Sequence, residues 1–190
     1  MKSNINKSSG NNLILSIGMI VKNEEKHLDN CLSALKRFMN QIPCELIIVD
    51  TGSTDRTKEI ALKYTDKVYD FEWINDFAAA RNFGLEKAKG KWFMFLDADE
   101  YMDEDCSEMV SFFSMPELYE KYNSASYIIR NYDDNVTKSA NDFLGSRLIK
   151  LKPGVKFEGA IHEYLPGALP HGYFLSLIHI SEPTRLLSIS

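Results

Sequence analysis

The chain has 190 residues, of which 44% are hydrophobic and 26% are charged, a composition typical of a folded globular chain and not of a disordered or fibrous one. Its 22 basic and 27 acidic residues give a net charge of −5 without a basic cluster, which argues against nucleic acid as a partner. Three widely spaced cysteines, Cys31, Cys44 and Cys106, lack a Cys-x-x-Cys pair, so we expect neither a disulfide framework nor a zinc site, and a reducing, cytoplasmic compartment. No uncharged apolar run reaches the roughly 18 residues that cross a bilayer, so no membrane span is expected in this chain.

The two ends of the chain differ from its middle. Residues 1–12 are rich in Asn, Ser and Lys and are predicted to form a flexible leader. Residues 175–185 resemble the in-frame translation of a transposase adapter used in sequencing-library preparation, so 175–190 are interpreted as a non-native tail. We therefore expect one domain over residues 13–174, truncated near its C-terminal end.

The first elements predict a β-α-β unit. Residues 13–21 and 45–50 are short apolar runs rich in Ile and Val, typical of buried strands. Between them, apolar residues recur at steps of three and four over residues 24–40, which indicates one face of a helix.

The same alternation continues to residue 96. Residues 53–55 offer N-cap side chains for a helix around Ile60, and a short strand follows at 67–71. A helix is indicated from Phe77 to near Gly90, and residues 91–96 form the next predicted strand. The order predicts an α/β fold with an open, mostly parallel sheet flanked by helices.

After residue 105 the pattern changes. One more helix is indicated over residues 106–113, and Pro116 interrupts it. Residues 125–131 and 146–152 are predicted strands around a polar turn at 133–135, which suggests a small antiparallel addition.

Polar residues follow three of the predicted strands, where ligands bind in open α/β sheets. They are Asn23 and Glu24, Asp50 and Thr51, and Asp97 and Asp99. Converging carboxylates repel one another unless a cation offsets their charge, and Asp97 and Asp99, two residues apart, face the same way in an extended chain. They are therefore candidate ligands for Mg²⁺ or Mn²⁺. Taken alone, each motif is also typical of a solvated turn or a helix cap, and that alternative stays open at this point.

Three segments carry a resemblance to a known family. They are Ile-Val-Asp-Thr-Gly-Ser-Thr-Asp at 48–55, Asp-Phe-Ala-Ala-Ala-Arg-Asn at 76–82 and Phe-Leu-Asp-Ala-Asp-Glu at 95–100. In order and spacing they resemble the family-two glycosyltransferases with the Rossmann-like GT-A fold, over residues 14–163. The resemblance implies an inverting, metal-dependent transfer of a sugar from a nucleotide-diphosphate sugar to an acceptor hydroxyl. The acceptor, whether saccharide, lipid or protein, is left open.

The resemblance also implies residue roles. Asn23, Glu24 and Asp50 would lie near the nucleotide, Arg81 near the base or diphosphate, and Asp97 at the donor, with Asp97 and Asp99 on the metal. Thr51 stands where many members carry a second Asp that contacts the base. A hydroxyl can still hydrogen-bond a base edge, and a UDP-sugar is the expected donor.

An inverting transfer needs a general base near the acceptor hydroxyl. Glu163, in Gly-Ala-Ile-His-Glu, is the candidate because similar transferases carry a His-Glu pair after the antiparallel addition, and Asp142 is the second choice. His162 is predicted as a further metal ligand, because an imidazole nitrogen suits Mn²⁺. Trp73 and Phe77 are candidates for the walls of the donor pocket, although aromatic residues beside a helix are more often core.

Two other functions compete with a transferase. One is a catalytically silent module that binds a nucleotide sugar. The other is a haloacid-dehalogenase-like phosphatase, which also uses Asp-x-Asp at a strand end. That class needs the motif on the first strand and a Thr or Val where this chain has Tyr101. A phosphatase is therefore less favoured than a transferase or a binding module.

Overall fold

The computed structural model describes residues 13–132, 141–166, 172–175 and 181–183. Its strands are β1 (Leu15–Val21), β2 (Cys44–Asp50), β3 (Val68–Asp70), β4 (Trp92–Phe95), β5 (Ser124–Tyr132), β6 (Asn141–Lys150), β7 (Gly172–Leu175) and β8 (Ser181–Pro183). Its helices are α1 (Leu28–Met39), α2 (Thr57–Ala61), α3 (Phe77–Leu85), α4 (Ser107–Ser114) and α5 (Pro116–Tyr119).

The strands form one eight-stranded sheet in the order β3-β2-β1-β4-β6-β5-β7, with β8 also paired to β5. The half containing β3, β2, β1 and β4 is parallel, whereas β6 runs antiparallel to both β4 and β5. The predicted parallel sheet with an antiparallel addition is therefore confirmed. β7 and β8 pair with β5 in parallel. The predicted leader, the polar turn at 133–135 and most of the predicted tail lie outside the described residues.

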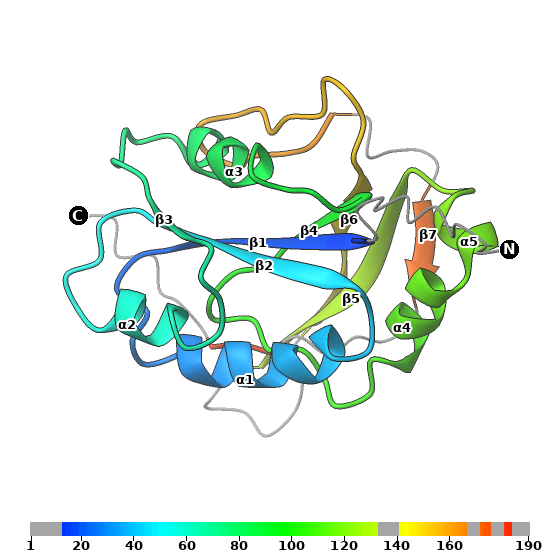
Figure 1. Cartoon of the computed structure of the whole chain (residues 1–190), viewed down its shortest axis with the longest axis horizontal. Helices are drawn as coiled ribbons and strands as arrows, with labels where there is room; N and C mark the ends of the chain where they lie inside the picture. The colour runs from blue at the N-terminus through cyan, green and yellow to red at the C-terminus, as the bar shows by residue number, and fades with distance from the viewer. Residues whose placement is uncertain (1–12, 133–140, 167–171, 176–180, 184–190) are drawn as a thin grey trace, which may run out of the picture.

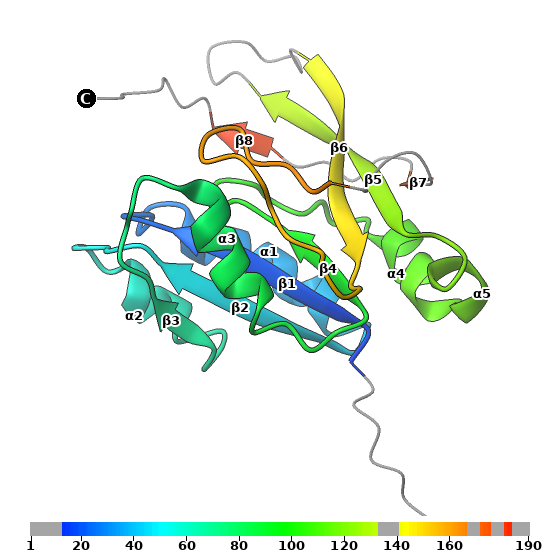
Figure 2. The same cartoon turned by 90° about the horizontal axis from the view of Figure 1, so that it is seen from above.

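Helices cover both faces of the parallel half. Figures 1 and 2 show α1 and α2 on one face and α3 on the other. The amphipathic helix α1 buries the predicted stripe, Leu28, Cys31, Leu32, Leu35 and Phe38, in the larger hydrophobic core. A smaller buried cluster on the α3 side includes Phe93, Phe95 and Phe157. In the described part of the chain, no helix has the length and apolar character required to cross a membrane.

Gly18, at the centre of β1, leaves room for a side chain of the neighbouring strand β4. A Cβ atom at this position would lie 2.2 Å from Cζ of Phe93, whose ring is buried on β4. The side chain of Phe93 therefore fills the space above β1 that any larger residue at position 18 would occupy.

Helix boundaries differ from the prediction for local reasons. α1 begins at Leu28 and not near residue 24, because residues before it form a turn in which the Glu24 carbonyl accepts from the amides of His27 and Leu28. The N-cap residue of α2 is Arg56 and not Asp55. Oδ1 of Asp55 nevertheless accepts from the amide of Thr57, the first residue of the helix, at 2.9 Å. α3 is capped by Asp76, which accepts from the amide of Ala79.

Candidate active site

Asp50 ends β2 with one carboxylate oxygen satisfied and the other not. Its Oδ1 accepts from the amides of Gly52 at 2.9 Å and Ser53 at 2.7 Å, and Gly52 holds a φ of 100°, which favours glycine. Its Oδ2 is buried and has no hydrogen-bond partner among the described residues. A buried acceptor left without a donor costs about 1–3 kcal/mol, so an N–H group of a ligand placed here would recover free energy.

The loops after β1 and β2 are joined by hydrogen bonds. Asn23, with a φ of 55°, accepts at Oδ1 from the amide of Thr54 at 2.8 Å, while its own amide donates to Oγ of Ser53 at 3.0 Å. The amide of the buried Glu24 donates to Oγ1 of Thr57 at 2.6 Å. Two residues predicted at the nucleotide, Asn23 and Glu24, therefore link the end of β1 to the Asp50 loop and to the start of α2.

Thr51 is buried beside Asp50. Its Oγ1 donates to the carbonyl of Val21 at 3.1 Å, and its amide donates to the same carbonyl at 3.0 Å. The hydroxyl hydrogen is thus engaged within the protein. Only the lone pairs of Oγ1 remain for a ligand.

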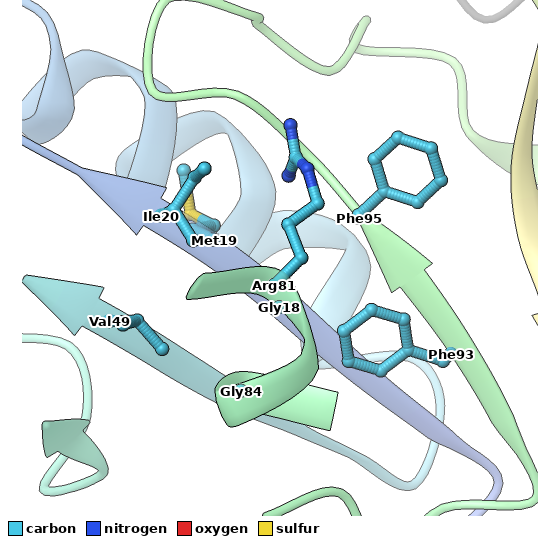
Figure 3. Close-up of a pocket in the computed structure, with 8 residues that line it drawn as sticks. All are labelled: Gly18, Met19, Ile20, Val49, Arg81, Gly84, Phe93 and Phe95. Carbon is cyan, nitrogen blue, oxygen red and sulfur yellow. The ribbon is translucent and has the colours of Figure 1, made fainter. Parts of the chain in front are cut away.

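Arg81 connects two acidic residues from distant parts of the chain. Its Nε donates to Oε1 of Glu163 at 2.6 Å, and its Nη2 donates to Oδ1 of Asp97 at 2.7 Å. The side chain is only 6% exposed, and it extends from α3 alongside Phe95, with Cζ 4.9 Å from the ring centroid (Figure 3). The candidate base and the first Asp of Asp-x-Asp are therefore brought together by one guanidinium group.

A second arginine reaches Asp97 from β6. Nη2 of Arg147 lies 2.5 Å from Oε1 of Glu100 and 3.4 Å from Oδ2 of Asp97. Oε2 of Glu100 accepts from the amide of Asp97 at 3.0 Å, and the Glu100 side chain is fully buried. Burial raises the pKa of Asp97, but the guanidinium groups of Arg81 and Arg147 outweigh this effect and hold the pKa below its usual range.

Negative charge accumulates around Cys31 on α1. Burial raises the pKa of the Cys31 thiol, and the charges of Glu100, Asp99 and Asp97 raise it further. With Glu24 and Glu163, the described residues of this region include five carboxylates and the two guanidinium groups of Arg81 and Arg147. The excess negative charge favours a bound cation.

The donor set is compatible with a divalent metal at Asp97 and Asp99. Carboxylate oxygens are the ligands that Mg²⁺ and Mn²⁺ prefer, and one carboxylate offers about four lone-pair sites, of which the two guanidinium groups engage two at Asp97. Within the residues the structure describes, no three or more His, Cys, Asp or Glu side chains gather as a metal-binding group. His162 is exposed beside Glu163 and holds a φ of 58°.

The cavity below Arg81 is too small for a nucleotide. It measures about 10 Å³ and lies between α3 and the sheet (Figure 3). Its lining is formed by Gly18, Met19, Ile20, Val49, Arg81, Gly84, Phe93 and Phe95. This space is therefore not a nucleotide pocket.

The other candidates named from the sequence are Trp73, Phe77 and Asp142. Trp73 and Phe77 pack edge to face with centroids 4.8 Å apart, and Phe77 is exposed, so these rings do not belong to the core. The side chain of Asp142 lies outside the described residues.

Glu100 and Arg147 were missed as site residues. A weak signal for Arg147 was its position in a predicted strand two residues before Ile149, on the same face, where a charge needs a partner. For Glu100, the signal was a third acidic residue immediately after Asp-x-Asp.

Comparisons with known proteins give the family of the chain. Residues 16–153 match the family described as Glycosyl transferase family 2. Over 156 residues the chain is 33% identical to a TPR repeat-containing protein of Synechococcus elongatus, covering 82% of this chain and 36% of that protein. Over 152 residues it is 32% identical to the SPbeta prophage-derived glycosyltransferase SunS of Bacillus subtilis, covering 78% of this chain and 34% of SunS. The chain thus spans about a third of the length of these relatives.

A solved structure has a similar fold. The structure of S. aureus TarS 1-349 aligns with a TM-score of 0.52 at 24% identity, covering 68% of this chain and 39% of TarS 1-349. A further TarS structure is a complex with UDP-GlcNAc. The phosphatase alternative is set aside by the family match, which spans all three sequence motifs. The chain belongs to glycosyl transferase family 2.

Proposed function

We propose that this chain is the donor-binding part of an inverting, metal-dependent glycosyltransferase. It would transfer a sugar from a nucleotide-diphosphate sugar to the hydroxyl group of an acceptor. The observation that carries the proposal is the bridge from Glu163 through Arg81 to Asp97 at the carboxyl ends of the parallel strands. The guanidinium group of Arg81 thereby links Glu163, which is proposed to act on the acceptor, to Asp97, which is proposed to bind the donor.

The buried Oδ2 of Asp50 supports a uridine donor. Uracil carries an imino N–H that an unpartnered carboxylate oxygen accepts, whereas cytosine has no proton on the equivalent ring nitrogen. Thr51 would contribute only as an acceptor, because its hydrogen is donated to Val21. The UDP-GlcNAc complex of TarS, a protein of similar fold, agrees with this donor class.

The diphosphate would lie above Asp97 and Asp99. When bound, a divalent cation supplies positive charge where negative charge develops on the leaving diphosphate. Asp97 and Asp99 would hold that cation through carboxylate oxygens. Among the described residues Arg81 donates through Nε and Nη2, and a further N–H of the guanidinium group would donate to a phosphate oxygen.

Glu163 would act as the general base. Within the described part of the chain its hydrogen bonds involve Oε1 alone, which leaves Oε2 to accept the proton of the acceptor hydroxyl. The hydroxyl oxygen forms its bond to the anomeric carbon as the bond to the diphosphate oxygen breaks. Attack from the face opposite to the leaving group inverts the configuration at that carbon.

Calorimetric titration of the 190-residue chain with UDP, with and without Mn²⁺, tests the binding step. We expect Asp97→Asn and Asp99→Asn each to weaken Mn²⁺-dependent binding. Asp66→Asn is the matched control. This exposed carboxylate precedes β3 and so lies at the amino ends of the parallel strands, whereas the site lies at their carboxyl ends. Unchanged affinity in both site variants would overturn the metal assignment.

A turnover measurement separates an enzyme from a silent binding module. The complete natural protein should release UDP from a UDP-sugar in the presence of acceptor or water. Glu163→Gln should keep UDP binding and lose this release. Binding by the parent protein without any turnover would support the silent module instead.

A further inference from the structure

We infer that Glu100 and Arg147 are positioning residues that fix Asp97 for donor binding, an inference that rests on the function proposed above. Neither residue is assigned to contact the donor. Their role is to hold both the backbone and the carboxylate of Asp97 in one orientation.

The contacts form a closed circuit around Asp97. Glu100 accepts from the Asp97 amide through Oε2 at 3.0 Å and from Arg147 through Oε1 at 2.5 Å. Arg147 in turn reaches Oδ2 of Asp97 at 3.4 Å. The amide of Glu100 donates to the Asp97 carbonyl at 3.1 Å, which closes the turn that carries Asp97 and Asp99. The circuit begins and ends on Asp97, so it restrains the main chain and the side chain together.

The two side chains of this circuit that come from outside Asp97 are buried. The Glu100 side chain has no exposed surface, and the Arg147 side chain is 15% exposed. A buried carboxylate requires a cation and hydrogen bonds to remain charged, and Arg147 provides the cation. β6 carries Arg147 to this place, because its neighbour Leu148 pairs with Met94 of β4.

The unequal distances explain why Asp97 keeps capacity for a ligand. Arg147 lies 2.5 Å from Glu100 but 3.4 Å from Asp97, so of these two carboxylates Glu100 is the closer partner. Without the charge of Glu100, Arg147 would shift towards Asp97 and occupy the lone pairs that a cation needs. Glu100 thus keeps Arg147 from neutralising Asp97 completely.

Glu100→Gln tests this inference against a matched variant. Glu45→Gln also removes a buried carboxylate with a cationic partner, Lys67, but far along β2 from Asp50. We expect both variants to lower the urea midpoint. Only Glu100→Gln should weaken Mn²⁺-dependent UDP binding, by about 10–100-fold, as is typical when the partners of a metal ligand are lost. UDP binding without metal should be equal in the two variants.

Arg147→Lys serves as a second variant where Glu100→Gln does not fold. Lysine keeps the charge opposite Glu100, but its single ammonium group does not reproduce the planar fork that spans Glu100 and Asp97. It should therefore fold and still lose affinity for UDP with Mn²⁺. Parent-like Mn²⁺ dependence in a folded Glu100 or Arg147 variant, or an equal loss in Glu45→Gln, would overturn the inference.

The outcomes also separate this inference from the proposed function. If the parent chain does not bind UDP with Mn²⁺, the proposed function and this inference both fail. If the parent binds UDP and Asp97→Asn weakens the binding, but Glu100→Gln and Arg147→Lys do not, then only the positioning role fails.

Discussion

Arg81 and Glu163 are 82 positions apart in the chain, and a hydrogen bond of 2.6 Å joins the Nε of the first to the Oε1 of the second. A backbone hydrogen bond of 3.0 Å from Phe77 to Ala160 ties the same two segments together at the start of α3. The segment of the candidate base Glu163 is therefore bound to α3, whose Arg81 also donates to Asp97.

Replacing Arg81 with methionine should destabilise the protein. Asp97 and Glu163 would lose their shared cation, and removing one partner of a buried ion pair costs about 3–5 kcal/mol. Urea denaturation gives the difference in unfolding free energy. Arg56→Met is the control, because its ion pair with Glu59 is exposed on both sides. Equal losses in the two variants would contradict the importance of the bridge.

Replacing Gly18 with alanine should strain the packing between β1 and β4. The added Cβ would lie 2.2 Å from Cζ of Phe93, and overpacking of a core costs about 1–3 kcal/mol. Combining it with Phe93→Leu should give a smaller loss than the sum of the single variants, since the smaller side chain leaves room. Strict additivity in urea denaturation would show that this contact does not limit position 18.

Glu45 should make stability depend on pH in the acid range. Burial raises its pKa, but hydrogen bonds from Lys67, Ser16 and the amide of Lys89, with the charge of Lys67, outweigh burial and lower the pKa from 4.5. A lowered folded-state pKa contributes stability above the unfolded value, and this contribution is lost as the pH falls through the folded value. The difference in unfolding free energy between the parent and Glu45→Gln should be constant above about pH 5 and shrink below about pH 4.5. A difference that grows on acidification would have the wrong sign.

Two substitutions of His162 should distinguish a role in metal binding from a role in backbone conformation. Its φ of 58° favours glycine, so His162→Gly should keep or raise stability, by up to about 1 kcal/mol, whereas His162→Ala keeps the strained backbone. If the imidazole is a metal ligand, both variants should weaken Mn²⁺ binding equally in a metal titration. Parent-like Mn²⁺ affinity in both would remove His162 from the metal site.

The local pattern of the sequence predicts the parallel half of the fold well. The apolar runs became β1, β2 and β4, and the helical spacing of residues 24–40 became α1. Periodicity could not predict that α1 starts only at Leu28, because the amide of Glu24 in the preceding turn donates to Oγ1 of Thr57, the first residue of α2. β6 is also longer than predicted and begins at Asn141.

The candidate site, like the fold, can be predicted only in part from the sequence. The positions of Asp50 at the end of β2 and of Asp97 after β4 could be predicted, because parallel strands align their carboxyl ends. The pairing of Arg147 with Glu100 was not found, because the two residues are 47 positions apart and meet only through the pairing of β6 with β4. Such charge pairs depend on the tertiary fold, which no local pattern encodes.

The hydrogen bonds between the loops after β1 and β2 have an energetic consequence for the ligand. Asn23 forms hydrogen bonds with Ser53 and Thr54 across these loops, so the end of the site proposed to bind the base would be preorganised. Binding then loses little conformational entropy at this end, and more of the contact energy with the base appears as affinity.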